Sequence, residues 1–266
     1  MDIRAVFCDV DGTLLNDEHR ISQGTADAVH ALQGRGIRFV IVSARSPSGL
    51  YPILKRYGFT CPLICYSGAL VLGEDRSVLR ENGMDAHAAL SVLRYTENRG
   101  YDLAWNLYSY DRWIVRDTED ERIIREQNIV EARAKQAESG VIGADEKVHK
   151  LLLICRESDT DQVAEDLSGR FPALTVVRSS GILVEVMNKG VDKAGAAGWL
   201  LDSWGLRAEE AMAFGDQYND LEMLRFAGTG IAMGNAPEQV RAAADYVTED
   251  NNSGGIEKAL KRFKVI

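Results

Sequence analysis

The stretch that decides the fold runs from Arg4 to Gly12 and reads RAVFCDVDG. A short apolar run that stops at two acids and a glycine predicts a buried strand that ends at a turn. Asp9 and Asp11 are therefore expected at the carboxyl end of this strand. In open parallel sheets, this end of the strands is where ligands bind.

Helices and strands alternate after this first strand. The alternation predicts a doubly wound, Rossmann-like parallel sheet of the α/β class, because parallel neighbours need a crossover connection. Ser22 is the expected N-cap of the first helix, and a break is expected near Pro52 in the second. The expected elements are strands at residues 4–10, 37–42 and 63–66 and helices at 22–32 and 47–57.

The pattern changes after Gly68 and returns near residue 192. The middle of the chain is expected to hold helices at 85–98, 118–138 and 161–171, a hairpin at 101–115, and strands at 148–155, 174–178 and 182–187. The final part is expected to hold helices at 192–204 and 255–263 and strands at 211–214 and 230–233. Because the first and last parts share one architecture, we predict a discontinuous core at residues 1–82 and 188–266, with an inserted α+β cap at 83–187.

Composition narrows the classes of partner. The formal net charge is -9, with 31 Lys and Arg against 40 Asp and Glu, which disfavours a nucleic-acid partner because that affinity comes from clustered cations. We see no apolar run of membrane-spanning length and no leader, so no membrane partner and a cytoplasmic location are expected. The four cysteines form no CxxC pair and are expected to be reduced and mostly buried. Oligomeric state cannot be read from the sequence.

Four predicted strands end in polar clusters. The clusters are Asp9/Asp11, Ser43/Arg45, Ser67/Gly68 and Asp216/Asn219/Asp220. We expect them to converge on one crevice at the carboxyl edge of the sheet. Oxygen ligands without a nearby histidine or cysteine suit magnesium rather than zinc, and a phosphate is the natural partner of such an ion.

Three other ligand motifs are excluded. A calcium loop that starts at Asp9 would need glycine at position 14 and glutamate at position 20, where the chain has Leu14 and Arg20. The sequence contains no GxxxxGK[ST] loop for a nucleoside triphosphate. The first strand is not followed by GxGxxG, the signature of a dinucleotide site.

Two strings together resemble the haloacid dehalogenase superfamily, and specifically its Cof-type phosphatases. They are DVDGTLL at residues 9–15 and GDQYND at residues 215–220. The resemblance spans nearly the whole chain. It also covers Ser43, Lys193, residues 233–236 and 252–256, and a large cap between Gly68 and Lys193.

This resemblance implies that Asp9 is the nucleophile and Asp11 the general acid/base. A carboxylate attacks better when magnesium draws charge from the phosphoryl oxygens, whereas a proton carrier needs a raised pKa. It also implies that Mg²⁺ lies between Asp9, the backbone carbonyl of Asp11 and Asp216. Asp220 would be a further ligand or an acceptor outside the ligand shell, unless it only caps a helix N-terminus.

The resemblance further implies that a lysine neutralises the phosphate and Asp9 together. Lys193 is the preferred candidate because it is predicted to open a helix, and Lys189 is the alternative. Ser43 would donate its hydroxyl to a phosphoryl oxygen, unless it merely caps the following helix. Asn219 would donate to the phosphate or to the substrate.

Two strand ends depart from the pattern of the resembled family. The chain has Ser43-Ala44-Arg45 where Thr-Gly-Arg is common, and Ser67-Gly68-Ala69 where Asn-Gly-Ala is common. Ser67 offers one donor where asparagine offers two, so a substrate contact is expected to be missing or bridged by water. Arg45 is expected either to bind substrate or to pair with an acid.

The leading hypothesis is a phosphatase for a small phosphorylated metabolite such as a sugar phosphate, because a large cap would exclude bulky phosphoproteins. A sugar phosphomutase that shares the aspartyl-phosphate step is the second hypothesis. A protein that only senses phosphate or binds a partner on this fold is the third.

Overall fold

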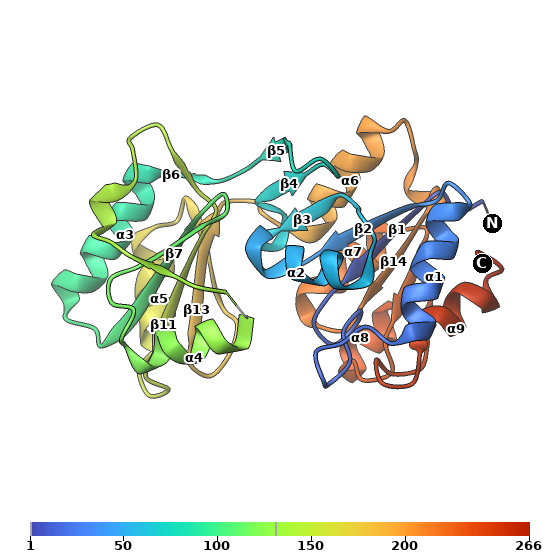
Figure 1. The fold of residues 1–266 in the computed structure, drawn as a ribbon. Helices are drawn as coiled ribbons and strands as arrows, with labels where there is room; N and C mark the ends of the chain where they lie inside the picture. The colour runs from blue at the N-terminus through green and yellow to red at the C-terminus, as the bar shows by residue number, and fades with distance from the viewer. Residues whose placement is uncertain (1, 131) are drawn as a thin grey trace. The chain divides into compact units, whose positions relative to one another are not determined.

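Residues 5–9 form β1, which lies inside an eight-stranded sheet of the computed structural model (Figure 1). The structure describes residues 2–130 and 132–266. These residues divide into two compact units, which we describe separately. The first unit holds residues up to 44, 52–80 and 192–266, and the second holds 45–51 and 81–191.

The sheet of the first unit is largely parallel. From β1 outward, β2 and β14 pair with it in parallel on either side, whereas β3 and β4 pair antiparallel to each other. In spatial order its strands are β16 (Tyr246–Val247), β15 (Thr229–Ala232), β14 (Ala211–Gly215), β1 (Ala5–Asp9), β2 (Arg38–Val42), β3 (Leu63–Cys65), β4 (Leu70–Leu72) and β5 (Val78–Glu81). The predicted doubly wound α/β class is confirmed.

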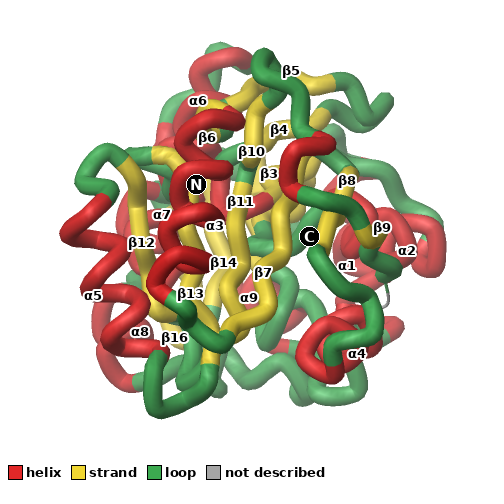
Figure 2. Tube along the Cα trace, turned by 90° about the vertical axis from the view of Figure 1, so that its left-hand side faces the viewer, coloured by secondary structure: helices red, strands yellow, loops and turns green. Residues whose placement is uncertain are grey.

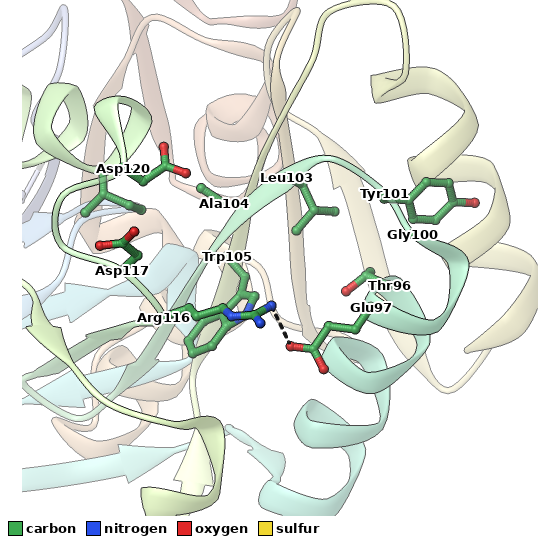
Figure 3. A pocket seen from close by; sticks show the side chains of 11 residues that line it. Thr96, Glu97, Gly100, Tyr101, Leu103, Ala104, Trp105, Arg116, Asp117 and Asp120 are labelled. Carbon is green, nitrogen blue, oxygen red and sulfur yellow. Dashed lines mark ion pairs between the residues drawn. The ribbon is translucent and has the colours of Figure 1, made fainter.

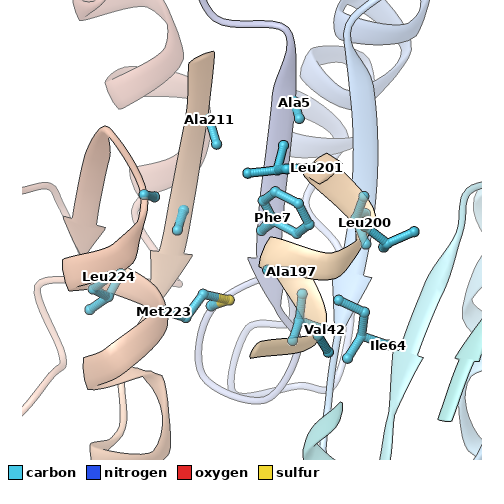
Figure 4. Packing of buried hydrophobic residues seen from close by; sticks show 14 of the residues in the cluster. Ala5, Phe7, Val42, Ile64, Ala197, Leu200, Leu201, Ala211, Met223 and Leu224 are labelled. Carbon is cyan, nitrogen blue, oxygen red and sulfur yellow. The ribbon is translucent and has the colours of Figure 1, made fainter. Parts of the chain in front are cut away.

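Helices cover this sheet from two sides. Ser22 caps α1 (Gln23–Gly34), as predicted, because its hydroxyl accepts the N–H of Thr25. The other helices of this unit are α6 (Lys193–Ser203), α7 (Leu221–Phe226), α8 (Glu238–Ala243) and α9 (Gly255–Arg262). Helix α2 (Pro47–Tyr57) begins in residues of the second unit and ends in residues of the first. Leu200 and Leu201 of α6 pack on Ala5 and Phe7 of β1 in a buried apolar cluster (Figure 4).

The second unit is a six-stranded sheet with helices on it (Figures 1 and 2). Its strands in spatial order are β12 (Leu174–Arg178), β13 (Leu183–Asn188), β11 (Lys150–Cys155), β7 (Leu103–Ser109), β8 (Arg112–Val115) and β9 (Lys135–Gln136). Helices α3 (Ala86–Arg99) and α5 (Thr160–Arg170) share an apolar cluster with one face of this sheet. A separate pair joins β6 (Met84–Asp85) to β10 (Lys147–Val148), and α4 spans Glu121–Val130.

Two predictions about helices are wrong. The long helix expected at 118–138 is only α4, because residues 135–136 form β9 and pair in parallel with β8 at the sheet edge; residue 131 lies outside the described residues. The helix at 47–57 shows no break at Pro52. A proline removes one N–H, and this helix continues without that one bond.

Within the described ranges, 2–130 and 132–266, no helix is both long enough and apolar enough to cross a membrane.

Candidate active site

Asp9 and Lys193 meet at the carboxyl edge of the first unit's sheet. Asp9 is the last residue of β1, and Lys193 is the first residue of α6. The Lys193 Nζ lies 2.6 Å from Asp9 Oδ1 and 2.6 Å from Asp220 Oδ1. All three side chains are buried, with exposed fractions of 5%, 1% and 0% for Asp9, Lys193 and Asp220. Lys189, the alternative lysine, is exposed.

Both oxygens of Asp220 are engaged. While Oδ1 accepts from Lys193, Oδ2 accepts the backbone N–H groups of Asp216 and Gln217 at 3.0 and 2.9 Å. The carboxylate thereby closes the turn between β14 and α7 and holds the lysine over Asp9. This arrangement fits the expected role of an acceptor outside the ligand shell better than that of a direct ligand.

Asp216 is surrounded by neutral donors. Its Oδ1 accepts from the buried Thr13 hydroxyl at 2.8 Å, and its Oδ2 accepts from Gln217 Nε2 at 3.1 Å and from Asn235 Nδ2 at 3.3 Å. Asp216 is 2% exposed. Three neutral hydrogen bonds orient the carboxylate without cancelling its charge.

Gly12 lets the loop after β1 approach Asp216. Its φ is +82°, and a Cβ there would lie 2.4 Å from Asp216 Oδ2. Both facts exclude a side chain, because the left-handed region and the close approach each penalise one. The glycine of the DVDGT string is therefore required by the geometry of the site.

Burial raises the pKa of Asp9 well above its usual range, and the nearby charge of Asp220 adds to the rise while Lys193 opposes it. Burial also raises the pKa of Asp216, against the lowering effect of the Thr13 hydrogen bond. For Lys193, burial alone would lower the pKa, but the charges of Asp9 and Asp220 raise it above its ordinary value. The site therefore keeps a charged lysine near Asp9 and Asp216, two carboxyl groups whose burial opposes ionisation.

A divalent metal ion could be held where the three carboxylates meet. One oxygen from each of Asp9, Asp216 and Asp220 lies within 4.8 Å of the other two. Against one lysine, three carboxylates that were all ionised would leave two formal negative charges uncompensated in a buried place. A divalent cation offsets that charge, and an all-oxygen donor set suits a hard ion such as Mg²⁺ or Ca²⁺.

The neighbouring strand ends join the same edge. The backbone N–H of Ser67 donates to the carbonyl of Ser43 at 2.9 Å, which ties the end of β3 to the end of β2. Gly68 has φ of +113°, and a Cβ there would lie 2.3 Å from the carbonyl oxygen of Asp192, so this loop reaches the start of α6. Ser43 is 1% exposed.

Three predicted site residues lie outside the buried group formed by Lys193 and the three carboxylates. Asp11 and Asn219 are exposed, the first just after β1 and the second in the turn that ends at Asp220. Arg45 belongs to the second unit.

Thr13, Gln217 and Asn235 were not predicted as site residues. Thr13 and Gln217 lie inside the two quoted strings, and Asn235 lies in MGNA at 233–236. All three side chains carry hydrogen-bond donors and lie in or beside the strings that resemble the family, which was the available signal. Only the fold shows that all three donate to Asp216.

A cavity of about 240 Å³ lies in the second unit (Figure 3). Arg116 and Glu97 pair across it at 3.6 Å. It is lined by Thr96, Glu97, Gly100, Tyr101, Leu103, Ala104, Trp105, Arg116, Asp117, Asp120 and Ile123. None of the predicted site residues is among them, and Trp105 belongs to the apolar cluster under α3 and α5.

Comparison with known proteins agrees with this geometry. The sequence profile of the haloacid dehalogenase-like hydrolases matches residues 6–260. The chain therefore belongs to the haloacid dehalogenase-like hydrolase family. A candidate phosphatase of Haemophilus influenzae is 33% identical to it, with 98% of each chain covered.

Two solved structures are similar over almost the whole chain. A haloacid dehalogenase-like hydrolase from Bacteroides thetaiotaomicron has a TM-score of 0.90 and 27% identity, covering 98% of this chain and 99% of that one. A sugar phosphatase of subclass IIB has a TM-score of 0.84 and 26% identity, covering 99% and 100%. Within the family the chain is accordingly a phosphatase of the Cof type, as predicted.

Proposed function

We propose that the protein is a Mg²⁺-dependent phosphatase that hydrolyses a small phosphorylated metabolite through an aspartyl-phosphate on Asp9. The observation that carries the proposal is the buried group in which Lys193 lies 2.6 Å from both Asp9 and Asp220, with Asp216 beside them. Such a group concentrates charge of both signs where a phosphate dianion can be bound.

Asp9 and Asp216 would hold the ion, with the Asp11 carbonyl, while Asp220 would act through Lys193 and the 215–220 turn. When bound, Mg²⁺ supplies positive charge to the phosphoryl oxygens and lets Asp9 stay ionised despite its burial. Lys193, held by two carboxylates, adds a fixed cation at the same place. Ser43 and the backbone near Gly68 are available as donors to the phosphate.

In the first half-reaction, an Asp9 oxygen forms a bond to phosphorus as the bond from phosphorus to the leaving oxygen breaks. Asp11 gives its proton to that leaving oxygen. Asp11 is exposed and lies two residues beyond Asp9, so it is able to exchange protons with solvent between steps.

In the second half-reaction, water attacks the phosphorus of the aspartyl-phosphate while Asp11 accepts a proton from it. The Asp9–phosphorus bond breaks, inorganic phosphate leaves, and both carboxyl groups return to their starting states. Asp11 thus serves first as the acid and then as the base.

The substrate class rests on two relatives. One is the subclass IIB sugar phosphatase, and another is a 5-amino-6-(5-phospho-D-ribitylamino)uracil phosphatase of Bacillus subtilis, 25% identical over 99% of this chain and 96% of its own. Both names describe a phosphate on a sugar or a polyol. We therefore infer a small phosphorylated sugar or polyol derivative as the substrate, recognised by the proposed cap at 83–187.

The test is a screen of phosphorylated metabolites with Mg²⁺ and with excess chelator. Phosphate release should need the ion and return when Mg²⁺ is restored. Undiminished turnover in chelator would refute the metal assignment, and an isomerised product with a bisphosphate activator would indicate a mutase instead.

A further inference from the structure

Several side chains tie the loop that follows β1 to the rest of the first unit, and one of them is the exposed Asn235. Its Nδ2 donates to the carbonyl of Gly12 at 2.9 Å and to Asp216 Oδ2 at 3.3 Å. One amide group therefore bridges this loop, residues 10–17, which we call the nucleophile loop, and the carboxylate of Asp216 just after β14. These two segments are more than 200 residues apart in the chain.

The orientation of this amide is fixed by its partners. On the other side, Asn235 Oδ1 accepts the backbone N–H of Asn251 at 3.2 Å. A backbone N–H only donates and a backbone carbonyl only accepts. The bond from Asn251 therefore identifies the oxygen of the Asn235 amide, and the bond to Gly12 independently identifies its nitrogen. The donor must therefore point at Asp216.

Asn251 holds the same loop a second time. Its Nδ2 donates to the carbonyl of Leu15 at 3.0 Å and to Asp17 Oδ1 at 3.2 Å. The segment before α9 thus contacts the nucleophile loop both directly and through Asn235. Asn252 also bonds Asp17 and donates to Asn251 Oδ1, but among the described residues its partners include neither Asn235 nor Asp216.

We propose that Asn235, oriented by Asn251, is a positioning residue that locks the nucleophile loop to Asp216 and thereby sets the distance between the two arms of the metal site. This inference rests on the proposed metal-dependent function. Gln217 also donates to Asp216 Oδ2, at 3.1 Å, but in the part of the chain that the structure describes it does not bond Gly12. Thr13, a residue of the loop itself, also donates to Asp216, at Oδ1, but Asn235 in addition bonds the loop backbone at Gly12 and is oriented by Asn251.

The first measurement is Mg²⁺ binding by calorimetry without substrate. Replacing a side chain that orients a metal ligand typically weakens the metal by about 10-fold or more. We expect Asn235→Ala to weaken Mg²⁺ binding about 10-fold, Gln217→Ala by only about 2-fold, and the control Asn252→Ala by less than about 2-fold. Equal losses in Asn235→Ala and Gln217→Ala would reduce Asn235 to one donor among several and overturn the bridge.

The second measurement needs no metal. The backbone N–H groups of Leu14 and Leu15 bond the carbonyls of Asp9 and Val10 inside the loop. Loss of the bridge should speed their hydrogen exchange in Asn235→Ala by about 5- to 10-fold, roughly the effect of one hydrogen bond. Asn235→Asp keeps the acceptor for Asn251 but turns an oxygen toward Gly12, so exchange should be faster still.

The two measurements separate the two proposals. If the natural protein binds no Mg²⁺ but the loop still exchanges faster in Asn235→Ala, the metal assignment fails and the lock stands. If the natural protein binds Mg²⁺ and Asn235→Ala changes neither the affinity nor the exchange, the lock fails alone.

Discussion

Asp9 and Asp11 are two residues apart and lie in opposite environments. Asp9 is buried against Lys193, whereas Asp11 is exposed just beyond the strand. Two carboxyl groups whose surroundings differ in this way can divide the work of attack and proton transfer.

Asp9→Asn and Asp11→Asn should therefore fail differently. Asp9→Asn should abolish turnover, because uncatalysed phosphate-monoester hydrolysis is slower by up to ~10²¹-fold than the enzymatic reaction. General acid/base work contributes about 10²–10⁴-fold, so Asp11→Asn should retain a trace of activity that rises as the leaving group's pKa falls. Rates on a series of aryl and acyl phosphates measure this.

Mass spectrometry of quenched Asp11→Asn gives a second readout. The added phosphoryl group should appear on the peptide that contains Asp9, since no base then activates water. An adduct on another residue, or equal losses in both mutants whatever the leaving group, would contradict the roles.

Lys193 and Lys189 form a matched pair of lysines. Lys193→Ala should lower turnover by two or more orders of magnitude and leave buried carboxylates without their cation, whereas exposed Lys189→Ala should change little. Steady-state rates at saturating Mg²⁺ check this. Similar losses from both substitutions would mean that the cation at the phosphate is the wrong lysine.

His149 gives a prediction about pH. Its side chain is fully buried, its Nδ1 accepts the N–H of Tyr110, and burial lowers its pKa to about 4. Between pH 6.5 and 4, His149 therefore binds a proton in the unfolded chain but stays neutral in the folded chain. The contribution of neutral His149 to the free energy of unfolding is complete above pH 6.5 and is lost as the pH falls toward 4, by up to about 3 kcal/mol.

Urea unfolding between pH 7.5 and 4.5 measures this loss. His149→Gln should flatten the dependence over that range, because glutamine does not titrate. An unchanged slope in His149→Gln would assign the loss to other groups.

At the scale of elements, the loop between β1 and the rest of the core depends on Gly12. Gly36 offers a control, because its φ is +74° and a Cβ there would meet no atom within 4 Å, whereas Gly12 faces Asp216. Both alanine substitutions should cost about 1–2 kcal/mol for the left-handed backbone. Only Gly12→Ala should also weaken Mg²⁺ binding and turnover, because its Cβ displaces Asp216.

Denaturation midpoints and Mg²⁺ titrations of the two variants separate these effects. A Gly36→Ala variant with the same loss of metal affinity would show that the loss reflects general destabilisation.

At the scale of the whole molecule, each unit has its own apolar core. Leu200 and Phe7 belong to the cluster of the first unit, and Leu107 and Leu153 to that of the second. All carboxylates of the candidate metal site lie in the first unit.

Mg²⁺ should consequently stabilise one unit selectively. A ligand at 100 times its dissociation constant stabilises its folded state by about 2.7 kcal/mol. In scanning calorimetry we expect two transitions, of which only the one that belongs to the first unit moves upward with Mg²⁺. Equal shifts of both, or one shared transition, would show that the units unfold together.

Local sequence signals predicted much of the fold. The apolar run before Asp9, the Ser22 cap and the change of pattern after Gly68 all depend on neighbours in the chain, and β1, α1 and the α/β class followed from them. The meeting of Asp9, Asp216 and Lys193 was also predictable, because strand ends in a parallel sheet share one edge.

Other features were decided by contacts between distant segments. Residues 135–136 became β9 because the edge of β8 was available for pairing, a contact that helix propensity alone does not register. The short elements α7, α8 and β16 were not predicted, because elements of so few residues show too little hydrophobic periodicity to be recognised.

The sequence by itself indicated that Asp9, Asp216 and a lysine, preferably Lys193, gather at the carboxyl edge of the sheet. Only the tertiary structure decided how they are held: Asp220 turned toward Lys193 and two backbone N–H groups, and Asn235 set between Gly12 and Asp216. The physical reason is that a hydrogen bond depends on distance and direction within a few tenths of an ångström, and folding fixes these between residues far apart in the chain.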